Sequence, residues 1–364
     1  MQLHPDRRLS LAHERIARFI DAGEIGGAAL AVARGREVVA EWCGGEASPG
    51  TPATATTLWP LACMTKPYTA AAILALIEQG VFTLATPVHA LLPRFSGGGR
   101  EDVRVRHLLT HTAGLPRPEP ARVEEQLRRR APLAEILADA YELPLLSPPG
   151  TAFHYSDHGY GVLGQLAEAA TGSTFASLVE RLVLEPAGLQ QTFAVPPARV
   201  YDRIATVRGA LAEGTDGEAF NSTYARQLGH PGCCAVATIA DVLRFGRLFG
   251  PEPPATILGG ASVRLMTTDQ TGGQAVARVL PLYPAQRQPW GCGFAVRGRL
   301  GNGVDDMASP EAFHHAGAAG SLVLVDPGAG VTIAFASNRY IAAGFEEFVG
   351  RLTTVVNMVL AALT

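Results

Sequence analysis

A cysteine and a lysine stand three residues apart in the segment Cys63-Met64-Thr65-Lys66. Residues three apart on a helix share a face, so a helix that begins here would place the thiol beside the amine. The helix N-terminus and a nearby ammonium both favour the thiolate, the form of cysteine that attacks a carbonyl carbon. The segment therefore predicts Cys63 as a nucleophile and Lys66 as its partner; a small buried hydrophobic residue is the alternative for Cys63.

Lys66 is the only lysine in the chain, although lysine and arginine together number 30. A generic surface charge tolerates the exchange of lysine for arginine. A site that needs a compact amine able to lose its proton does not, because arginine stays protonated. Chance survival explains a lone lysine equally well, and the neighbouring Cys63 favours function.

Two further segments carry groups that an active-site cleft could use. Tyr155, in Tyr155-Ser156-Asp157, follows a Pro-Pro-Gly turn and could shuttle a proton, or could be an ordinary half-buried tyrosine. Ser156 and Asp157 also fit the start of a helix. The stretch 314–320, His-His-Ala-Gly-Ala-Ala-Gly, precedes an apolar strand, and its small residues would admit another backbone or a substrate. A glycine-rich turn is the alternative there.

The other histidines and cysteines give no metal motif. His107 and His111 have the i, i+4 spacing of a zinc helix, but the residues between them lack the glutamate of H-E-x-x-H, which favours a structural role. The cysteine count is odd and includes an adjacent pair, so reduced thiols are expected at Cys43, Cys63, Cys233, Cys234 and Cys292. We expect neither a metal nor an organic cofactor.

Hydrophobic periodicity indicates which elements must position these groups. Helices are predicted at 9–22, 64–79, 105–109, 132–141, 159–171, 240–249 and 345–363, and strands at 26–34, 37–42, 293–297, 321–325 and 331–337. Strands near both chain ends enclose a mostly helical block. This order favours an α/β domain assembled from residues 1–62 and 250–364, with a mainly helical domain inserted at 63–249.

Composition limits the classes of partner. Hydrophobic residues make up 47 % of the 364 and charged residues 17 %, which excludes global disorder. A net charge of −3 leaves no positive excess for binding phosphates, so no nucleic-acid partner is expected. No stretch approaches the ~18 apolar residues of a membrane span, and the N-terminus has no secretory leader pattern. We expect a soluble, cytoplasmic protein with no membrane partner.

The order of the motifs resembles the serine β-lactamase-related superfamily, which includes class C β-lactamases, D-aminopeptidases, family VIII carboxylesterases and acyltransferases. C-x-x-K is followed about ninety residues later by Tyr-Ser-Asp, and then by H-x-G-x-x-G before a C-terminal strand. The segments 106–115, 155–164 and 184–189 are similar to the family as well. The resemblance implies an antiparallel sheet flanked by helices and packed on a helical domain, with an acyl-transfer cleft between them.

The resemblance also implies roles for individual residues. By position, Cys63 is the nucleophile, Lys66 the base and Tyr155 the acid/base, and His315 belongs to a third catalytic motif. The backbone N–H groups of Cys63 and Ala318 would form the oxyanion hole. Substrate contacts are expected at Asp157 (where many relatives have asparagine), Gly317, Tyr224, Trp290 and the neighbourhood of Tyr283.

This sequence departs from the family at the nucleophile, which is serine in the relatives. A natural thiol enzyme, a serine enzyme whose nucleophile was exchanged, and a site that binds without turnover all remain open. A thiol needs less help from a base than an alcohol, and its thioester reacts with amines more readily, relative to water, than an ester does. We expect a biosynthetic acyltransferase that uses a small-molecule acyl donor and an amine or alcohol acceptor. An esterase or amidase and a non-catalytic binding protein are the alternatives.

Overall fold

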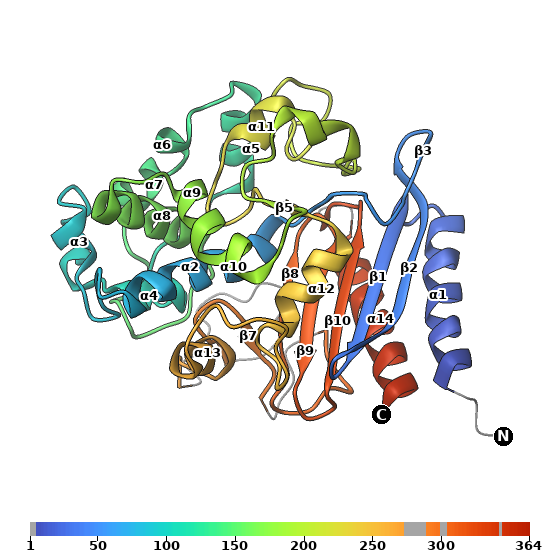
Figure 1. Cartoon of the computed structure of the whole chain (residues 1–364). Coiled ribbons are helices and arrows are strands. Elements are labelled where there is room, and N and C mark those ends of the chain that lie inside the picture. Colours follow the sequence, from blue (N-terminus) through green and yellow to red (C-terminus); the bar gives the residue numbers. More distant parts are fainter. Residues whose placement is uncertain (1–4, 273–288, 299–303, 342–343) are drawn as a thin grey trace.

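The computed structural model describes residues 5–272, 289–298, 304–341 and 344–364. Its large sheet contains β1 (Gly27–Arg34), β2 (Glu37–Ser48), β3 (Thr51–Pro52), β7 (Ala295–Val296), β8 (Phe313–Gly317), β9 (Ser321–Asp326) and β10 (Val331–Ser337). The order in space is β3-β2-β1-β10-β9-β8-β7, and neighbouring strands are antiparallel. The two chain ends meet at the β1–β10 pairing, so the predicted sheet built from both ends is confirmed (Figure 1).

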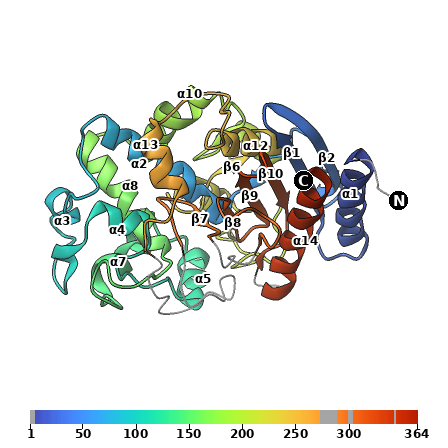
Figure 2. The ribbon, with the colours of Figure 1, turned by 90° about the horizontal axis from the view of Figure 1, so that it is seen from below.

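Helices cover both faces of this sheet (Figures 1 and 2). On one face lie α1 (Pro5–Asp21) and α14 (Phe345–Leu363), which contact each other, and on the other lies α12 (Ile239–Arg247). Successive side chains of a strand point to opposite faces; accordingly Leu30 of β1 lies in the core with α1 and α14, and Ala31 lies in the opposite core. The predicted domain boundary at 249 therefore falls after a helix that packs on the sheet.

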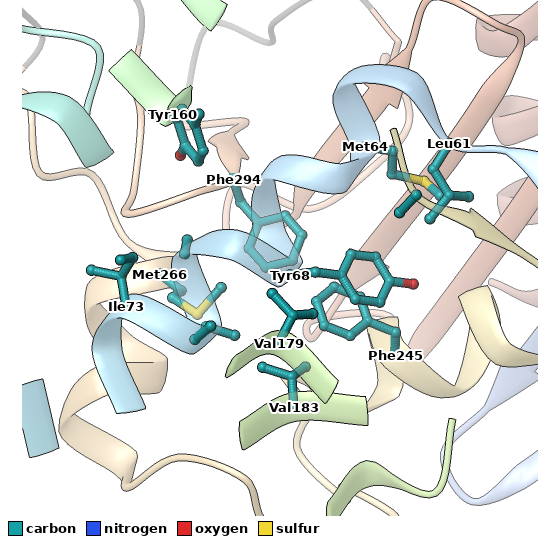
Figure 3. Close-up of a cluster of buried hydrophobic side chains, with 14 of the residues drawn as sticks. Leu61, Met64, Tyr68, Ile73, Tyr160, Val179, Val183, Phe245, Met266 and Phe294 are labelled. Carbon is teal, nitrogen blue, oxygen red and sulfur yellow. The ribbon is translucent and has the colours of Figure 1, made fainter. Parts of the chain in front are cut away.

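The centre of the helical region is α2 (Lys66–Glu78), preceded by the 3-10 turn η1 (Ala62–Thr65). Residues 66–76 are all buried, as expected for a helix that is apolar on every side and runs through a protein interior. Tyr68 of α2 stacks on Phe245 of α12 with ring centroids 3.6 Å apart, which joins the helical region to the helix on the sheet (Figure 3). Pro67 lies in the first turn, where a missing N–H costs little.

The remaining helical segments include one longer than α2, the 15-residue α8, and many short ones. The helical segments are α3 (Val88–Leu91), η2 (Arg100–Asp102), α4 (Val105–Leu109), α5 (Pro120–Arg128), α6 (Leu133–Ile136), α7 (Ala138–Glu142), α8 (Asp157–Thr171), α9 (Phe175–Val179), η3 (Glu180–Leu184), α10 (Glu185–Ala187), η4 (Ala198–Arg203), α11 (Thr223–Gln227) and α13 (Gly260–Thr267). A small sheet joins β4 (Trp59–Pro60), β6 (Val236–Ala237) and β5 (Thr192–Phe193). Within the described ranges, none of the helices has the length and apolar character of a bilayer span.

Candidate active site

Cys63 lies in a tight turn that is anchored to the sheet. The carbonyl of Leu61 accepts a hydrogen bond from Ser321 Oγ of β9 at 2.8 Å, and the Leu61 N–H donates to the carbonyl of Ala235 at 2.9 Å. Ala62 adopts a φ of +46°, a left-handed conformation that costs a residue with a Cβ about 1–3 kcal/mol. The anchored turn therefore holds the thiol in a defined position, at the wall of a cavity.

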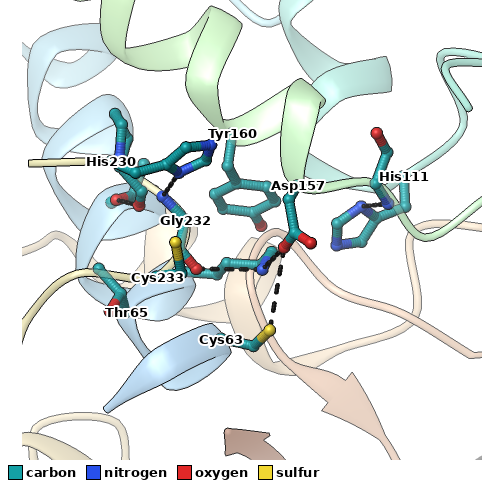
Figure 4. A network of polar contacts seen from close by, with 12 residues as sticks. Cys63, Thr65, His111, Asp157, Tyr160, His230, Gly232 and Cys233 are labelled. Atoms are coloured by element: carbon teal, nitrogen blue, oxygen red, sulfur yellow. Dashed lines mark hydrogen bonds and ion pairs between the residues drawn. The ribbon is translucent and has the colours of Figure 1, made fainter. Parts of the chain in front are cut away.

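The Lys66 amine forms a buried ion pair with Asp157. Lys66 Nζ lies 2.5 Å from Asp157 Oδ1 and 3.1 Å from the carbonyl oxygen of Gly232, and its side chain is 0 % exposed (Figure 4). Asp157 is the first residue of α8, where the helix dipole favours a carboxylate. The Cys63 thiol donates to the same Oδ1 at 3.8 Å. One carboxylate oxygen thus joins the predicted nucleophile and the predicted base.

The ion pair fixes the charge of both partners. Burial alone would raise the pKa of Asp157, but the Lys66 ammonium brings it well below its ordinary value. Burial alone would lower the pKa of Lys66, but the Asp157 carboxylate raises it above its ordinary value. Lys66 is therefore an ammonium ion and Asp157 a carboxylate across the neutral pH range.

The protonation of Cys63 differs from the sequence-based expectation of a thiolate. Burial raises the pKa of the Cys63 thiol, Lys66 opposes this shift, and Asp157 reinforces it. The expectation counted the ammonium but not the carboxylate that neutralises it. In the structure the thiol rests protonated.

Tyr155 stands next to this group. Its ring centroid lies 4.8 Å from Lys66 Nζ, and a hydrogen bond between its side chain and Cys63 lowers the pKa of the thiol, against the larger effect of burial. The half-buried ring lies beside a buried aromatic cluster of Phe153 and Trp290. Tyr155 is thus close enough to the sulfur for the predicted acid/base role, which stays a prediction.

His111 supports the loop that carries Tyr155. Its ring stacks on Tyr155 with centroids 4.3 Å apart, and its Nδ1 accepts the N–H of Ser156 at 3.1 Å. Burial lowers the pKa of His111 well below its ordinary value, so the ring is neutral. His111 lies beyond the end of α4 at a φ of +57°, so it does not share a helix face with His107, and the zinc-helix spacing has no structural counterpart.

A cavity of about 190 Å³ begins at Cys63. Its apolar lining includes Val123, Leu127, Ile136, Leu211, Phe220 and Leu228. Its polar and charged lining includes Cys63, Arg117, Asp157, Arg226, His230 and Cys233. Ala318 and Tyr340 reach it from the sheet, after β8 and β10. The cavity is therefore bounded by both parts of the molecule and is mostly apolar away from the sulfur.

At Gly317 the missing side chain has a structural reason. A Cβ on Gly317 would lie 2.0 Å from the carbonyl oxygen of Leu61 and 2.4 Å from Ser321 Oγ. The glycine thus admits the backbone next to Cys63, and the substrate contact predicted at Gly317 stays a prediction. Ala318, one residue later, does line the cavity together with Cys63. The oxyanion role predicted for their two N–H groups is compatible with this placement and stays a prediction.

Three other predicted site residues lie away from the cavity lining. His315 and Trp290 are completely buried, with ring centroids 5.7 Å apart, and both rings contact Tyr155 from behind. Tyr224 turns its hydroxyl to the carbonyl of Ala131, to which it donates at 2.6 Å. In the structure these side chains pack around the site, and the roles predicted for His315, Trp290 and Tyr224 stay predictions. Tyr283 lies outside the described residues.

The polar residues of the cavity wall that sequence reasoning missed include Arg117, Arg226, His230 and Cys233. His230 Nδ1 accepts the N–H of Gly232, the residue whose carbonyl binds Lys66, so this loop is folded around the amine. Arg117 follows the family-like segment 106–115 almost directly, which was a usable signal. The Cys233-Cys234 pair was visible, but nothing in its spacing connected it to Cys63.

Comparisons with known proteins agree with this geometry. The chain is 29 % identical over 325 residues to penicillin-binding protein 4 of Amycolatopsis lactamdurans, covering 84 % of this chain and 80 % of the relative. It is 34 % identical over 210 residues to esterase EstB of Burkholderia gladioli, covering 49 % of this chain and 53 % of the esterase.

Solved structures share the fold across nearly the whole chain. EstCE1, described as a hydrolase with promiscuous acyltransferase activity, has a TM-score of 0.77 at 22 % identity and covers 96 % of this chain and 99 % of its own. A family VIII carboxylesterase has a TM-score of 0.73 at 22 % identity, over 97 % of each chain. The family model described as Beta-lactamase matches residues 12–353. The chain therefore belongs to the Beta-lactamase family, as the order of its motifs indicated.

Proposed function

We propose that the protein is an acyltransferase that carries the acyl group as a thioester on Cys63. The sulfur attacks the carbonyl carbon of an ester or thioester donor, and the leaving group departs with the thiol proton. An amine or alcohol then attacks the thioester and takes the acyl group, which regenerates the thiol. The reaction would serve the biosynthesis of a small molecule.

The observation that carries the proposal is the position of the Cys63 thiol. It lies between the Lys66–Asp157 ion pair and a cavity of about 190 Å³. The apolar lining supports an apolar acyl group, since burial of its surface would contribute about 25 cal/mol per Å². Arg117, which is exposed and lies on the same wall, supports an anionic group elsewhere on the donor.

Sulfur favours transfer over hydrolysis. A thioester discriminates in favour of amines over water more strongly than an oxygen ester, so a thiol nucleophile suits amide formation. The fold neighbour EstCE1, described as a hydrolase with promiscuous acyltransferase activity, supports the view that this fold accommodates both reactions.

The test is a panel of acyl thioesters and p-nitrophenyl esters with acyl groups of graded length, each with and without an amine acceptor. We expect an acyl adduct on Cys63 by intact mass and peptide mapping, its discharge by the amine, and no adduct in Cys63→Ala. Cys43→Ala, on β2, is the matched control and should acylate normally. Absence of a Cys63 adduct with every donor would refute the proposal.

A carboxylesterase or amidase is the second candidate, and the similarity to esterase EstB supports it. The two functions differ in the fate of the same acyl-enzyme. If water discharges the adduct as fast with 10 mM amine present as without it, for every amine tried, the enzyme is a hydrolase.

A further inference from the structure

We propose that Asp157 makes this site suitable for a sulfur nucleophile and unsuitable for a hydroxyl. It holds Lys66 as an ammonium ion and itself takes the proton of Cys63. The proposal rests on the proposed function only in taking Cys63 as the nucleophile. Asp157 is thus more than a replacement for asparagine at a substrate-contacting position. It changes which side chain of the site can act as a base.

The geometry places two hydrogen-bond acceptors against Lys66 Nζ. The partners of Nζ are a carboxylate oxygen at 2.5 Å and a carbonyl oxygen at 3.1 Å, and neither can donate a hydrogen bond to a neutral amine. The lysine side chain is 0 % exposed, so a neutral amine would leave the Asp157 charge without its partner in a largely buried place. Lys66 therefore cannot readily become the base.

Asp157 is also placed to receive the nucleophile's proton. Its Oδ1 accepts the Cys63 thiol at 3.8 Å, as well as Lys66 Nζ. As the Sγ–C bond forms, the carbonyl π electrons move onto oxygen and the thiol proton passes to Oδ1. When the C–X bond of the donor breaks, Tyr155 gives its proton to X and recovers one from Asp157 through Lys66. The thiol proton thus leaves as X–H, and Asp157, Lys66 and Tyr155 return to their starting forms. Cys63 then carries the acyl group as a thioester.

This route suits a thiol and not a hydroxyl. A carboxylate is a weak base, and its pairing with Lys66 weakens it further, so it takes the proton only as the Sγ–C bond forms. A thiol, whose free pKa is near ~8.5, still gives up its proton far more easily than an alcohol, although burial raises the pKa of Cys63. A serine in place of Cys63 would need the neutral amine that Asp157 suppresses. The cysteine and the aspartate are therefore a matched pair of departures from the family.

The titratable and charged groups around the three side chains come from several segments. They are Tyr155 and Tyr160 near the start of α8, His111 after α4, Arg117, His230 and Cys233 in the loops, and His315 and Tyr340 from the sheet. Burial keeps His111 and His315 neutral by lowering the pKa of each. Burial raises the pKa of Tyr340 to about 12. Cys233 raises the pKa of His230 above its ordinary value, against the effect of burial. A His230→Gln background is therefore needed to separate the titration of His230 from that of Cys63.

The first experiment measures acylation by p-nitrophenyl acetate in four proteins: the wild type, Cys63→Ser, Asp157→Asn and the double variant. We expect Cys63→Ser to acylate at least 100-fold more slowly than the wild type. Adding Asp157→Asn to Cys63→Ser should raise the acylation rate at least tenfold, because the Lys66 amine can then lose its proton. Asp139→Asn in the Cys63→Ser background is the matched control, since Asp139 pairs with Arg122 outside the site at 2.6 Å, and it should restore nothing.

The second experiment needs no acyl donor. The rate of Cys63 alkylation by iodoacetamide is followed against pH by peptide mapping, with and without Asp157→Asn and in the His230→Gln background. Removal of the carboxylate should move the midpoint down by about one pH unit, because the negative charge that raises the pKa of the Cys63 thiol is then gone.

The two experiments separate the possible failures. If no donor acylates the wild type, the proposed function fails, and the alkylation profile still tests Asp157. An unchanged alkylation midpoint overturns the role of Asp157, as does a folded double variant that acylates no faster than Cys63→Ser. If the double variant does not fold, the alkylation midpoint of Asp157→Asn decides alone.

Discussion

The two walls of the cavity contribute different chemistry. The helical wall brings Lys66 and Asp157 together as an ion pair and places Tyr155 beside them. The sheet wall brings Ala318 to the cavity and keeps the ring of His315 buried behind Tyr155. Both walls are fixed by the same anchored turn, because Leu61 is hydrogen-bonded to β9 just before Cys63.

The helical wall supplies the groups for proton transfer, and the sheet wall positions the backbone. On the helical side, side chains share a proton network that ends at the sulfur. On the sheet side, the contribution is a close approach of backbone, made possible by Gly317. Substitutions on the helical wall should therefore affect the chemical step far more than substitutions on the sheet wall.

The largest effect is expected from Lys66→Met. It removes the ammonium that compensates Asp157, and acylation of Cys63 should fall by about 10³-fold, within the range for loss of a proton-transfer group. The unpaired carboxylate should also cost up to about 3 kcal/mol of stability. Acylation is measured by intact mass and stability by urea unfolding. The double variant with Asp157→Asn should recover stability but not acylation; recovery of acylation would remove Lys66 from the chemistry.

Tyr155→Phe should have the next largest effect. The phenyl ring keeps the stack on His111, so the free energy of unfolding should change by less than about 1 kcal/mol. Acylation should fall by about 10²-fold, because the hydroxyl that serves the leaving group is lost. Donors with better leaving groups should show a smaller loss. An equal loss for all donors would place Tyr155 outside leaving-group protonation.

The sequence predicts the fold and the helical wall better than the sheet wall. Strand periodicity at both chain ends indicated the sheet, and C-x-x-K placed Lys66 near Cys63. The protonation of Cys63 could not be predicted, because it depends first on the burial of the thiol and then on a carboxylate brought from 94 residues away. The burial of Trp290 and His315 could not be predicted for a different reason: aromatic and histidine side chains occur in cores and in clefts, and only the packing distinguishes the two. The predicted helix at 132–141 is two shorter ones, α6 and α7.

On the sheet wall, Gly317→Ala should have an intermediate effect. Its Cβ would meet the Leu61 carbonyl, so the backbone next to Cys63 must shift, at a cost of about 1–3 kcal/mol. Acylation should fall about tenfold through displacement of the sulfur. Gly350→Ala is the matched control, because nothing lies within 4 Å of its added Cβ. It should leave acylation unchanged and raise stability by up to about 1 kcal/mol, since Gly350 lies within α14 and alanine favours a helix over glycine. A Gly317→Ala protein with wild-type acylation would show that the turn tolerates the shift.

The smallest effect on chemistry is expected from His315→Phe. The phenyl ring can keep the aromatic contacts with Tyr155 and Trp290, while the polar contact of Nδ1 with the Ala316 carbonyl, 2.9 Å away, is lost. We expect acylation within threefold of the wild type, an unchanged pH profile and a stability loss of about 1 kcal/mol. A catalytic histidine would instead show a loss of about 10²-fold or more and an altered pH profile. Because the variant keeps an aromatic ring at this position and removes the imidazole nitrogens, such a loss would show that His315 takes part in the reaction. The two walls would then no longer differ in their contribution to the chemical step.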